Sequence, residues 1–345
     1  MEFLGLALPL LLLFISFGFM IGVLFGFFGM GGSFLITPTL LILGYPASVA
    51  IGSGLAFYFG TSVIAVMKHY DIGQVDYKLG AILFVVLSIG IELGSRLVFG
   101  LEALGVADLV TGVAYVVLLG GIGLLFLRRA SNLNGEDDDS EDGSEDDVSD
   151  TEIPPIGQKI QSYTVPPMIS LTSGGRASVW TITGAGGSVG LISGLIGVGG
   201  GFIRMPAIYY LIGTPLTAAV GTSLFAGLFA GAFGTFTYGM SGSVDLVVVS
   251  LLLVGSALGA RIGSAATTLV KEDNVIVYFG IMMLLASIGI AISELANWLG
   301  TSTLDIVSVL LLVGGATFVS LMILNQAYRA LTANQQPSPT PETSD

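Results

Sequence analysis

The 345-residue sequence has no cysteine and a single histidine, His69. The lack of cysteine excludes disulfides, thiolate metal sites and thiol nucleophiles, and one histidine leaves little room for a histidine-based metal centre. The sequence also has no Ser/His/Asp arrangement and no phosphate-binding loop. It therefore predicts neither an enzyme nor a protein with a metal ion or a cofactor.

Charge is scarce as well, because charged residues make up 10% of the chain against roughly a quarter in a soluble domain. Hydrophobic residues reach 53%, the mean hydropathy is +0.90, and no charged residue occurs from Phe3 to Met67. A membrane helix needs only about 20 apolar residues, so that stretch must contain several elements. The expected fold is all-α: a polytopic transmembrane bundle in the cell membrane.

Apolar runs and their breaks predict the helices. They are expected at 3–28, 33–43, 47–67, 78–99, 105–127, 179–197, 201–212, 216–238, 246–269, 275–297 and 304–325. The segments 33–43 and 201–212 are too short to span a bilayer, and each follows a glycine cluster, so we interpret both as halves of broken helices. This predicts about nine full spans and two half-helices. Because no basic segment precedes the first run, it is expected to be a retained helix rather than a signal peptide.

A hydrophilic segment divides the chain. We expect a first transmembrane repeat at 1–128, a disordered linker at 129–178, a second repeat at 179–328 and a disordered tail at 329–345. Eleven of the 24 acidic residues lie between Glu136 and Glu152, so most of the net charge of −13 is local. This acidity argues against nucleic acid as a partner; it fits either a high-salt habitat or a plain solvated spacer.

Basic residues near the predicted membrane edges suggest an orientation. Five of them fall on one side if 3–28 runs from inside to outside and the spans then alternate: Lys68, Lys78, Arg128, Arg129 and Arg176. The positive-inside rule makes this side cytoplasmic. Lys271 and Arg329 fit this pattern less well.

The two halves match each other in sequence. The motif Gly-Met-Gly-Gly-Ser-Phe-Leu-Ile-Thr-Pro at 29–38 aligns with Gly-Val-Gly-Gly-Gly-Phe-Ile-Arg-Met-Pro at 197–206, with five identical positions. One inserted residue later, further matches follow in register: Pro46, Ala50, Gly52, Leu55, Asp76, Gly90 and Gly94 with Pro215, Ala219, Gly221, Leu224, Asp245, Gly259 and Gly263. Duplicated halves with interrupted helices indicate a transporter whose binding site lies between the repeats.

The glycine clusters are the predicted site. Clustered glycines break a helix and leave backbone groups that lipid cannot satisfy, which is tolerated only beside protein or a polar cavity. The N-terminus of the helix that restarts there attracts an anion. The site residues from these breaks are Gly29, Gly31, Gly32, Gly197, Gly199, Gly200 and Gly201. Glycines that only allow tight helix packing are the alternative.

Ionisable residues within spans are further candidates, because each is costly there. Arg204, Arg261 and Arg96 would bring positive charge, and the guanidinium fork matches oxyanion geometry. Arg96 has an alternative role as an i, i+4 ion pair with Glu92. Arg204 and Arg261 have no such partner in sequence, although a side chain that extends to the interface is an alternative for both.

Two hydroxyl residues complete the candidate set. Ser53 and Thr222 occupy equivalent positions in the two halves and could line a polar cavity, although hydroxyl bonds to their own helices are equally compatible with the sequence. His69 lies at a span end, where an interfacial loop explains it better than a proton relay.

The motifs at 29–38 and 197–206, with the Gly-x-Val-Asp segments that end at Asp76 and Asp245, resemble the sulfite exporter TauE/SafE family of membrane permeases. The resemblance covers nearly the whole chain outside the linker and tail. It implies secondary transport of a small sulfur-containing anion, such as sulfite or a sulfonate, with a proton or another ion as a coupling partner. Ser33 departs from the doubled glycine motif and makes the two half-sites inequivalent.

Two other functions fit parts of the sequence. A membrane-embedded scaffold or assembly factor would act through the acidic linker. A cation transporter or channel would need more buried carboxylates than Glu92 alone. The leading prediction is a permease for a small anion that works by alternating access between the repeats.

Overall fold

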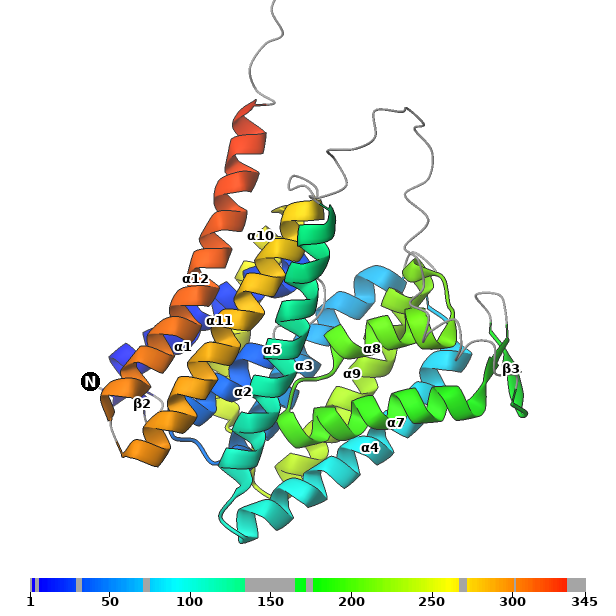
Figure 1. The fold of residues 1–345 in the computed structure, drawn as a ribbon, viewed down its shortest axis with the longest axis horizontal. Coiled ribbons are helices and arrows are strands. Elements are labelled where there is room, and N and C mark those ends of the chain that lie inside the picture. The colour runs from blue at the N-terminus through cyan, green and yellow to red at the C-terminus, as the bar shows by residue number, and fades with distance from the viewer. Residues whose placement is uncertain are drawn as a thin grey trace, which may run out of the picture.

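The computed structural model describes residues 2–3, 6–28, 33–70, 75–133, 165–171, 176–266, 272–300 and 302–333. Helices dominate these residues, as the apolar runs predict, and they form one bundle (Figure 1). Two short antiparallel ladders accompany them, β1 (Glu2–Phe3) with β2 (Leu6–Ala7) and β3 (Met168–Ser170) with β4 (Arg176–Ser178).

The helices follow the predicted order. The first half contains α1 (Leu8–Phe28), α2 (Ser33–Ile42), α3 (Ala47–Tyr70), α4 (Tyr77–Ala103) and α5 (Ala107–Leu133). The second half contains α7 (Val179–Ile196), α8 (Gly201–Ala207), the π-helix η1 (Ile208–Ile212), α9 (Leu216–Met240), α10 (Leu246–Ala266), α11 (Glu272–Leu299) and α12 (Ser302–Ala333).

Eight of the described helices are long and apolar enough to cross a membrane, namely α1, α4, α5, α7, α9, α10, α11 and α12. The helix α3 has 24 residues, but its apolar described part, Ala47–Val63, is shorter than a full span. Both predicted half-helices are present, α2 with 10 residues and α8 continued by η1. The structure therefore confirms an all-α polytopic membrane protein.

Several predicted boundaries shift. Phe3 lies in β1, and Leu6 and Ala7 lie in β2, so these three residues are not the start of the first helix. The helix α5 continues to Leu133, past the predicted linker start at 129, and β3 and β4 lie within the predicted linker. The helix α12 also extends to Ala333, into the predicted tail. The acidic tract at 136–152 lies outside the described residues.

Close glycine contacts pair helices from opposite halves. Along α1 and α10 the residue numbers of the contacting pairs increase in the same direction: Gly18 with Leu252, Gly22 with Ser256 and Gly26 with Ala260. The same holds along α4 and α7, where Gly90 contacts Gly187 and Gly190, and Gly94 contacts Leu191 and Gly194. Both pairs are therefore parallel, and small residues at i, i+4 spacing let their backbones touch.

The central helices α3 and α9 are antiparallel, because Gly231 lies against Tyr58 and Gly52 lies against Tyr238. The order of their contacts shows that α3 is parallel to α10. The starts of α1, α3 and α10 therefore lie at one end of the bundle, and the starts of α4 and α7 lie at the other. The first helices of the two halves, α1 and α7, thus run in opposite directions. This is the arrangement of inverted halves, although the duplication itself stays a prediction.

The two ends of the bundle differ in the balance of their described charged residues. One end, the acidic end, carries Glu102, Asp108, Asp245 and Glu294, at the C-terminal turns of α4 and α11 and beside the starts of α5 and α10. The opposite end, the basic end, carries Lys78, Arg128, Arg176 and Arg329, together with Asp76, which caps α4. Arg329 therefore lies with the other bases, contrary to the sequence prediction.

The predicted direction of the first helix is wrong. Since α2 turns back between α1 and α3, α1 and α3 run the same way and both start at the acidic end. The start of α1 therefore lies at the end of the bundle opposite Arg128, and not beside Arg128.

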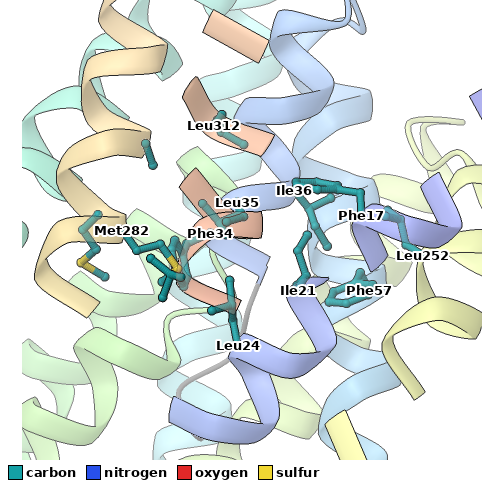
Figure 2. Close-up of a cluster of buried hydrophobic side chains, with 14 of the residues drawn as sticks. Phe17, Ile21, Leu24, Phe34, Leu35, Ile36, Phe57, Leu252, Met282 and Leu312 are labelled. Carbon is teal, nitrogen blue, oxygen red and sulfur yellow. The ribbon is translucent and has the colours of Figure 1, made fainter. Parts of the chain in front are cut away.

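The main core lies where α1, α2, α3, α10, α11 and α12 meet, and its buried side chains are apolar. Figure 2 shows Phe17, Ile21, Ile36, Phe57 and Leu252 gathered around the start of α2. Ile36 is fully buried there. Its equivalent in the second half is Arg204, so the two half-helices meet very different surroundings.

Candidate anion-binding site

The second glycine cluster ends a helix and starts another inside the bundle. The helix α7 ends at Ile196, and Gly197, Gly199 and Gly200 have φ of +74°, +59° and +70°, which side-chain-bearing residues rarely adopt. The chain then turns into α8, where the Gly200 carbonyl accepts from the backbone N–H of Arg204 at 2.7 Å. The glycines therefore place Arg204 one turn after the break.

Arg204 is the largest fully buried side chain of the described residues, with 1% of its surface exposed. Its Nε donates to Ser223 Oγ at 3.1 Å, Nη1 to the Gly199 carbonyl at 3.2 Å and Nη2 to the Tyr58 hydroxyl at 2.6 Å. The guanidinium carbon also lies 5.9 Å from the centre of the Tyr58 ring. The guanidinium thus connects α8 with α3 and α9.

No carboxylate among the described residues balances this charge. The three recorded partners of Arg204 are neutral oxygens, and across the described ranges the single ion pair joins Arg96 and Glu92. A buried ion without a counter-ion costs several kcal/mol. An anion that binds beside Arg204 would offset this cost.

The site lies near the middle of the bundle. Tyr58 is at the midpoint of α3, and Gly227 is at the midpoint of α9. A Cβ atom at Gly227 would collide with both Arg204 Nη2 and the Tyr58 hydroxyl. These contacts bring one residue of the first half against two of the second.

Ser193, one turn before the break, adds an unpaired hydroxyl. It is 2% exposed, and its Oγ has no hydrogen-bond partner among the described atoms. A Cβ built on Gly200 would stand 2.5 Å from Ser193 Oγ and 3.8 Å from Arg204 Nη1. The hydroxyl and the guanidinium thus flank the same glycine.

Ser53 and Thr222 lie away from Arg204 and bind backbone instead. Ser53 Oγ accepts from the N–H of Asp245 at 2.9 Å, and Thr222 Oγ1 accepts from the N–H of Asp76 at 2.9 Å. Each aspartate also caps a helix: Asp76 accepts from two N–H groups of α4, and Asp245 from two of α10. The two arrangements are equivalent in sequence and lie toward opposite ends of the bundle.

The other arginines are not brought to this site. Arg96 has 74% of its side chain exposed and pairs with Glu92 at 2.9 Å. This ion pair is the alternative role that the i, i+4 spacing suggested for Arg96. Arg261 is exposed on α10. Gly201 starts α8, whereas Gly29, Gly31 and Gly32 lie outside the described residues.

Sequence reasoning missed Tyr58, Ser193, Ser223 and Gly227. A tyrosine in the centre of an apolar run and a serine four residues before a glycine cluster were the available signals. Neither signal is specific, because their relevance depends on contacts between α3, α7, α8 and α9.

A polar cavity of about 240 Å³ opens at the acidic end, away from Arg204, between the loop after α2 and the helices α5 and α11. Asp108 and Glu294 line it, and Asp108 accepts from the N–H of Ala47 at 2.9 Å. Burial, and then the Asp245 carboxylate, raise the pKa of Tyr45, which also lines the cavity. Tyr45 therefore stays a neutral donor there.

Comparison with known proteins finds a family model and several membrane transporters. The family model described as "Sulfite exporter TauE/SafE" matches residues 14–290, which include both glycine clusters, Tyr58 and Arg204. The chain is 23% identical over 278 residues to the probable membrane transporter protein YunE of Bacillus subtilis (strain 168), covering 78% of this chain and 92% of that protein. A probable membrane transporter protein of Xylella fastidiosa (strain 9a5c) is 28% identical over 261 residues, which cover 73% and 82% of the two chains. No solved structure matches significantly.

Proposed function

Because the chain belongs to the sulfite exporter TauE/SafE family, we propose that it is a secondary transporter for a small sulfur-containing anion, an oxyanion or an organosulfonate. It is a multi-pass membrane protein, and its relatives are named as probable membrane transporters. The two halves, 1–128 and 179–328, are the units that move against each other in this proposal, with 129–178 as the linker between them.

The burial of Arg204 carries the proposal. An arginine at the centre of a membrane helix costs about 2.5–3.5 kcal/mol on insertion scales, and this one has no carboxylate partner in the described part of the chain. The planar guanidinium presents its N–H groups in a fork that fits two oxygens of an oxyanion. Arg204 is therefore the proposed substrate ligand, with the glycine break around it.

Alternating access requires a contact that closes each end in turn. The hydrogen bonds of Ser53 with Asp245 and of Thr222 with Asp76 join α3 to the start of α10 and α9 to the start of α4. Since they lie toward opposite ends, opening toward the acidic end would break the first, and opening toward the basic end would break the second. Both are closed here, which supports an occluded state.

The bases at Lys78, Arg128, Arg176 and Arg329 make the basic end cytoplasmic in this proposal. The N-terminus and the cavity at Asp108 and Glu294 then face outward. A proton or another small ion is the proposed coupling partner, so an imposed ion gradient should change the accumulation of substrate in sealed vesicles.

Uptake of radiolabelled sulfite and taurine into proteoliposomes tests the proposal. Wild-type protein should accumulate one of them, and Arg204→Ala should lower the initial rate by about tenfold or more, the effect of losing hydrogen bonds to a charged ligand. Arg261→Ala is the matched control, because Arg261 is exposed on α10, and it should keep the wild-type rate. Equal rates for wild type and Arg204→Ala would contradict the proposed site.

A further inference from the structure

We propose that the centre around Arg204 selects a singly charged anion whose head group is rich in hydrogen-bond acceptors, and that Tyr58 and Ser193 donate to it. The inference rests on the proposed anion transport. It adds the charge of the substrate and two residues that bind it.

The charge follows from the composition of the site. Arg204 supplies one positive charge, and its recorded neighbours Tyr58, Gly199 and Ser223 are neutral. Arg96 and Arg261 are exposed and cannot add to it. A monoanion makes the complex neutral, whereas a dianion would leave one negative charge in a low-dielectric interior, where uncompensated charge is expensive.

The hydrogen-bonding character of the ligand follows from the N–H and O–H groups of the site that have no recorded acceptor. A guanidinium has five N–H donors, and three recorded bonds leave two of them for a ligand. The Tyr58 oxygen accepts from Arg204, but no acceptor for its own proton is recorded among the described residues. Ser193 has no partner at all there. Each of these free groups can donate a hydrogen bond, so a head group rich in acceptor oxygens complements them.

The second half cannot replace Tyr58 by its own equivalent residue. The position that corresponds to Tyr58 is Gly227, and its lack of a side chain makes room for the Tyr58 hydroxyl and Arg204 Nη2. In the same way, the position that corresponds to Arg204 is Ile36, which lies in the apolar core (Figure 2). One half thus supplies the phenol and the other supplies the cation, and the site needs both.

The charge rule can be tested on the wild-type protein with two ligands of nearly the same shape. Methanesulfonate is a monoanion at every relevant pH, whereas methylphosphonate carries one negative charge in acid and two in alkali. Calorimetric titration of the purified full chain in detergent should show methanesulfonate binding equally at both pH values. Methylphosphonate should bind in acid and at least about tenfold more weakly in alkali. Equal binding of methylphosphonate at both pH values would overturn the charge rule.

The roles of the hydroxyls need variants. Tyr58→Phe keeps the ring and should weaken methanesulfonate binding by about tenfold or more, as expected for a hydrogen bond to a charged group, whereas Tyr77→Phe, on an exposed tyrosine at the start of α4, should not. Ser193→Ala should weaken binding without lowering the melting temperature, because its hydroxyl has no partner to lose.

The outcomes separate this inference from the function on which it depends. If neither methanesulfonate nor any sulfur oxyanion binds to or is transported by the wild type, the proposed function fails. If methanesulfonate binds but Tyr58→Phe and Ser193→Ala bind it with wild-type affinity, the transporter proposal stands and the assignment of the two donors is wrong.

Discussion

The Tyr58 hydroxyl lies 2.6 Å from Nη2 of Arg204 and accepts its hydrogen bond, although 146 positions separate the two residues in the chain. This bond joins the two halves near the middle of the bundle. It also explains how a guanidinium is held in an apolar interior, since neutral oxygens surround it in place of a carboxylate. The energetic cost that remains is the basis for the proposed anion.

Gly227 should be essential for transport because it lies against both residues. In Gly227→Ala the added methyl would collide with Arg204 and Tyr58, so the guanidinium must move and transport should fall by about tenfold or more. Gly239→Ala in the same helix is the matched control, since an added Cβ meets its first atom there at 4.0 Å. Similar uptake rates for the two variants would contradict this placement of Arg204.

The hydrogen bonds at Ser53 and Thr222 should contribute equally to the free energy of unfolding. Ser53→Ala and Thr222→Ala each remove the hydroxyl that accepts from one backbone N–H and should each cost about 1–3 kcal/mol of unfolding free energy. Because the two contacts lie at opposite ends, their effects should add. Chemical denaturation in detergent, with Ser250→Ala as a control at an exposed hydroxyl, measures this, and a cost in only one variant would contradict the equivalence.

The glycines of α1 should stabilise the fold. A methyl at Gly22 meets the backbone of Ser256, so Gly22→Ala should force α1 and α10 apart at a cost of about 1–3 kcal/mol. Gly121→Ala in α5 should be neutral or stabilising, because no atom lies within 4 Å of its added Cβ. Thermal melts of both variants test this, and equal melting temperatures would contradict the parallel packing of α1 on α10.

The proposed orientation can be measured directly, because the natural chain contains no cysteine. A membrane-impermeant maleimide should label Leu104→Cys, at the acidic end, from outside intact cells. It should label Arg128→Cys, at the basic end, only after permeabilisation. The reverse pattern would show that the basic end faces outward.

The acidic linker should be dispensable for transport. Deletion of 135–152 removes the eleven acids from Glu136 to Glu152 and leaves all residues around Arg204 in place. Uptake should therefore match wild type, after correction for the amount of protein in the membrane. A loss of uptake would contradict this prediction, because it would show that the linker takes part in transport; a membrane scaffold would instead lose its partner binding on deletion.

Much of the fold could be predicted because membrane helices follow local composition. Long apolar runs located α1, α4, α5 and α9 to within several residues, and glycine clusters located the two half-helices, since both signals are contiguous in sequence. The direction of α1 could not be predicted this way. It depends on whether α2 turns back, and a ten-residue apolar segment does not decide that.

The residues of the site, like the helices, could be predicted from the sequence only in part. Arg204 could be singled out from sequence because a charged residue inside an apolar run is costly wherever the helix packs. Arg96 and Arg261 gave the same signal, but the structure places both on the outside of the bundle. Tyr58, Ser193 and Gly227 gave almost none, because a hydroxyl or a glycine in a span acquires its role only from what lies opposite.

The sequence by itself therefore determined that this protein is a multi-pass membrane protein with glycine-broken helices and an arginine at one break, because hydrophobicity and backbone preference act locally. Only the tertiary structure decided which arginine is buried and which residues surround it. Parallel packing of α1 on α10 and of α4 on α7 brings the antiparallel pair α3 and α9 to the centre. That packing sets Tyr58 against Arg204, and no local property of either residue encodes it.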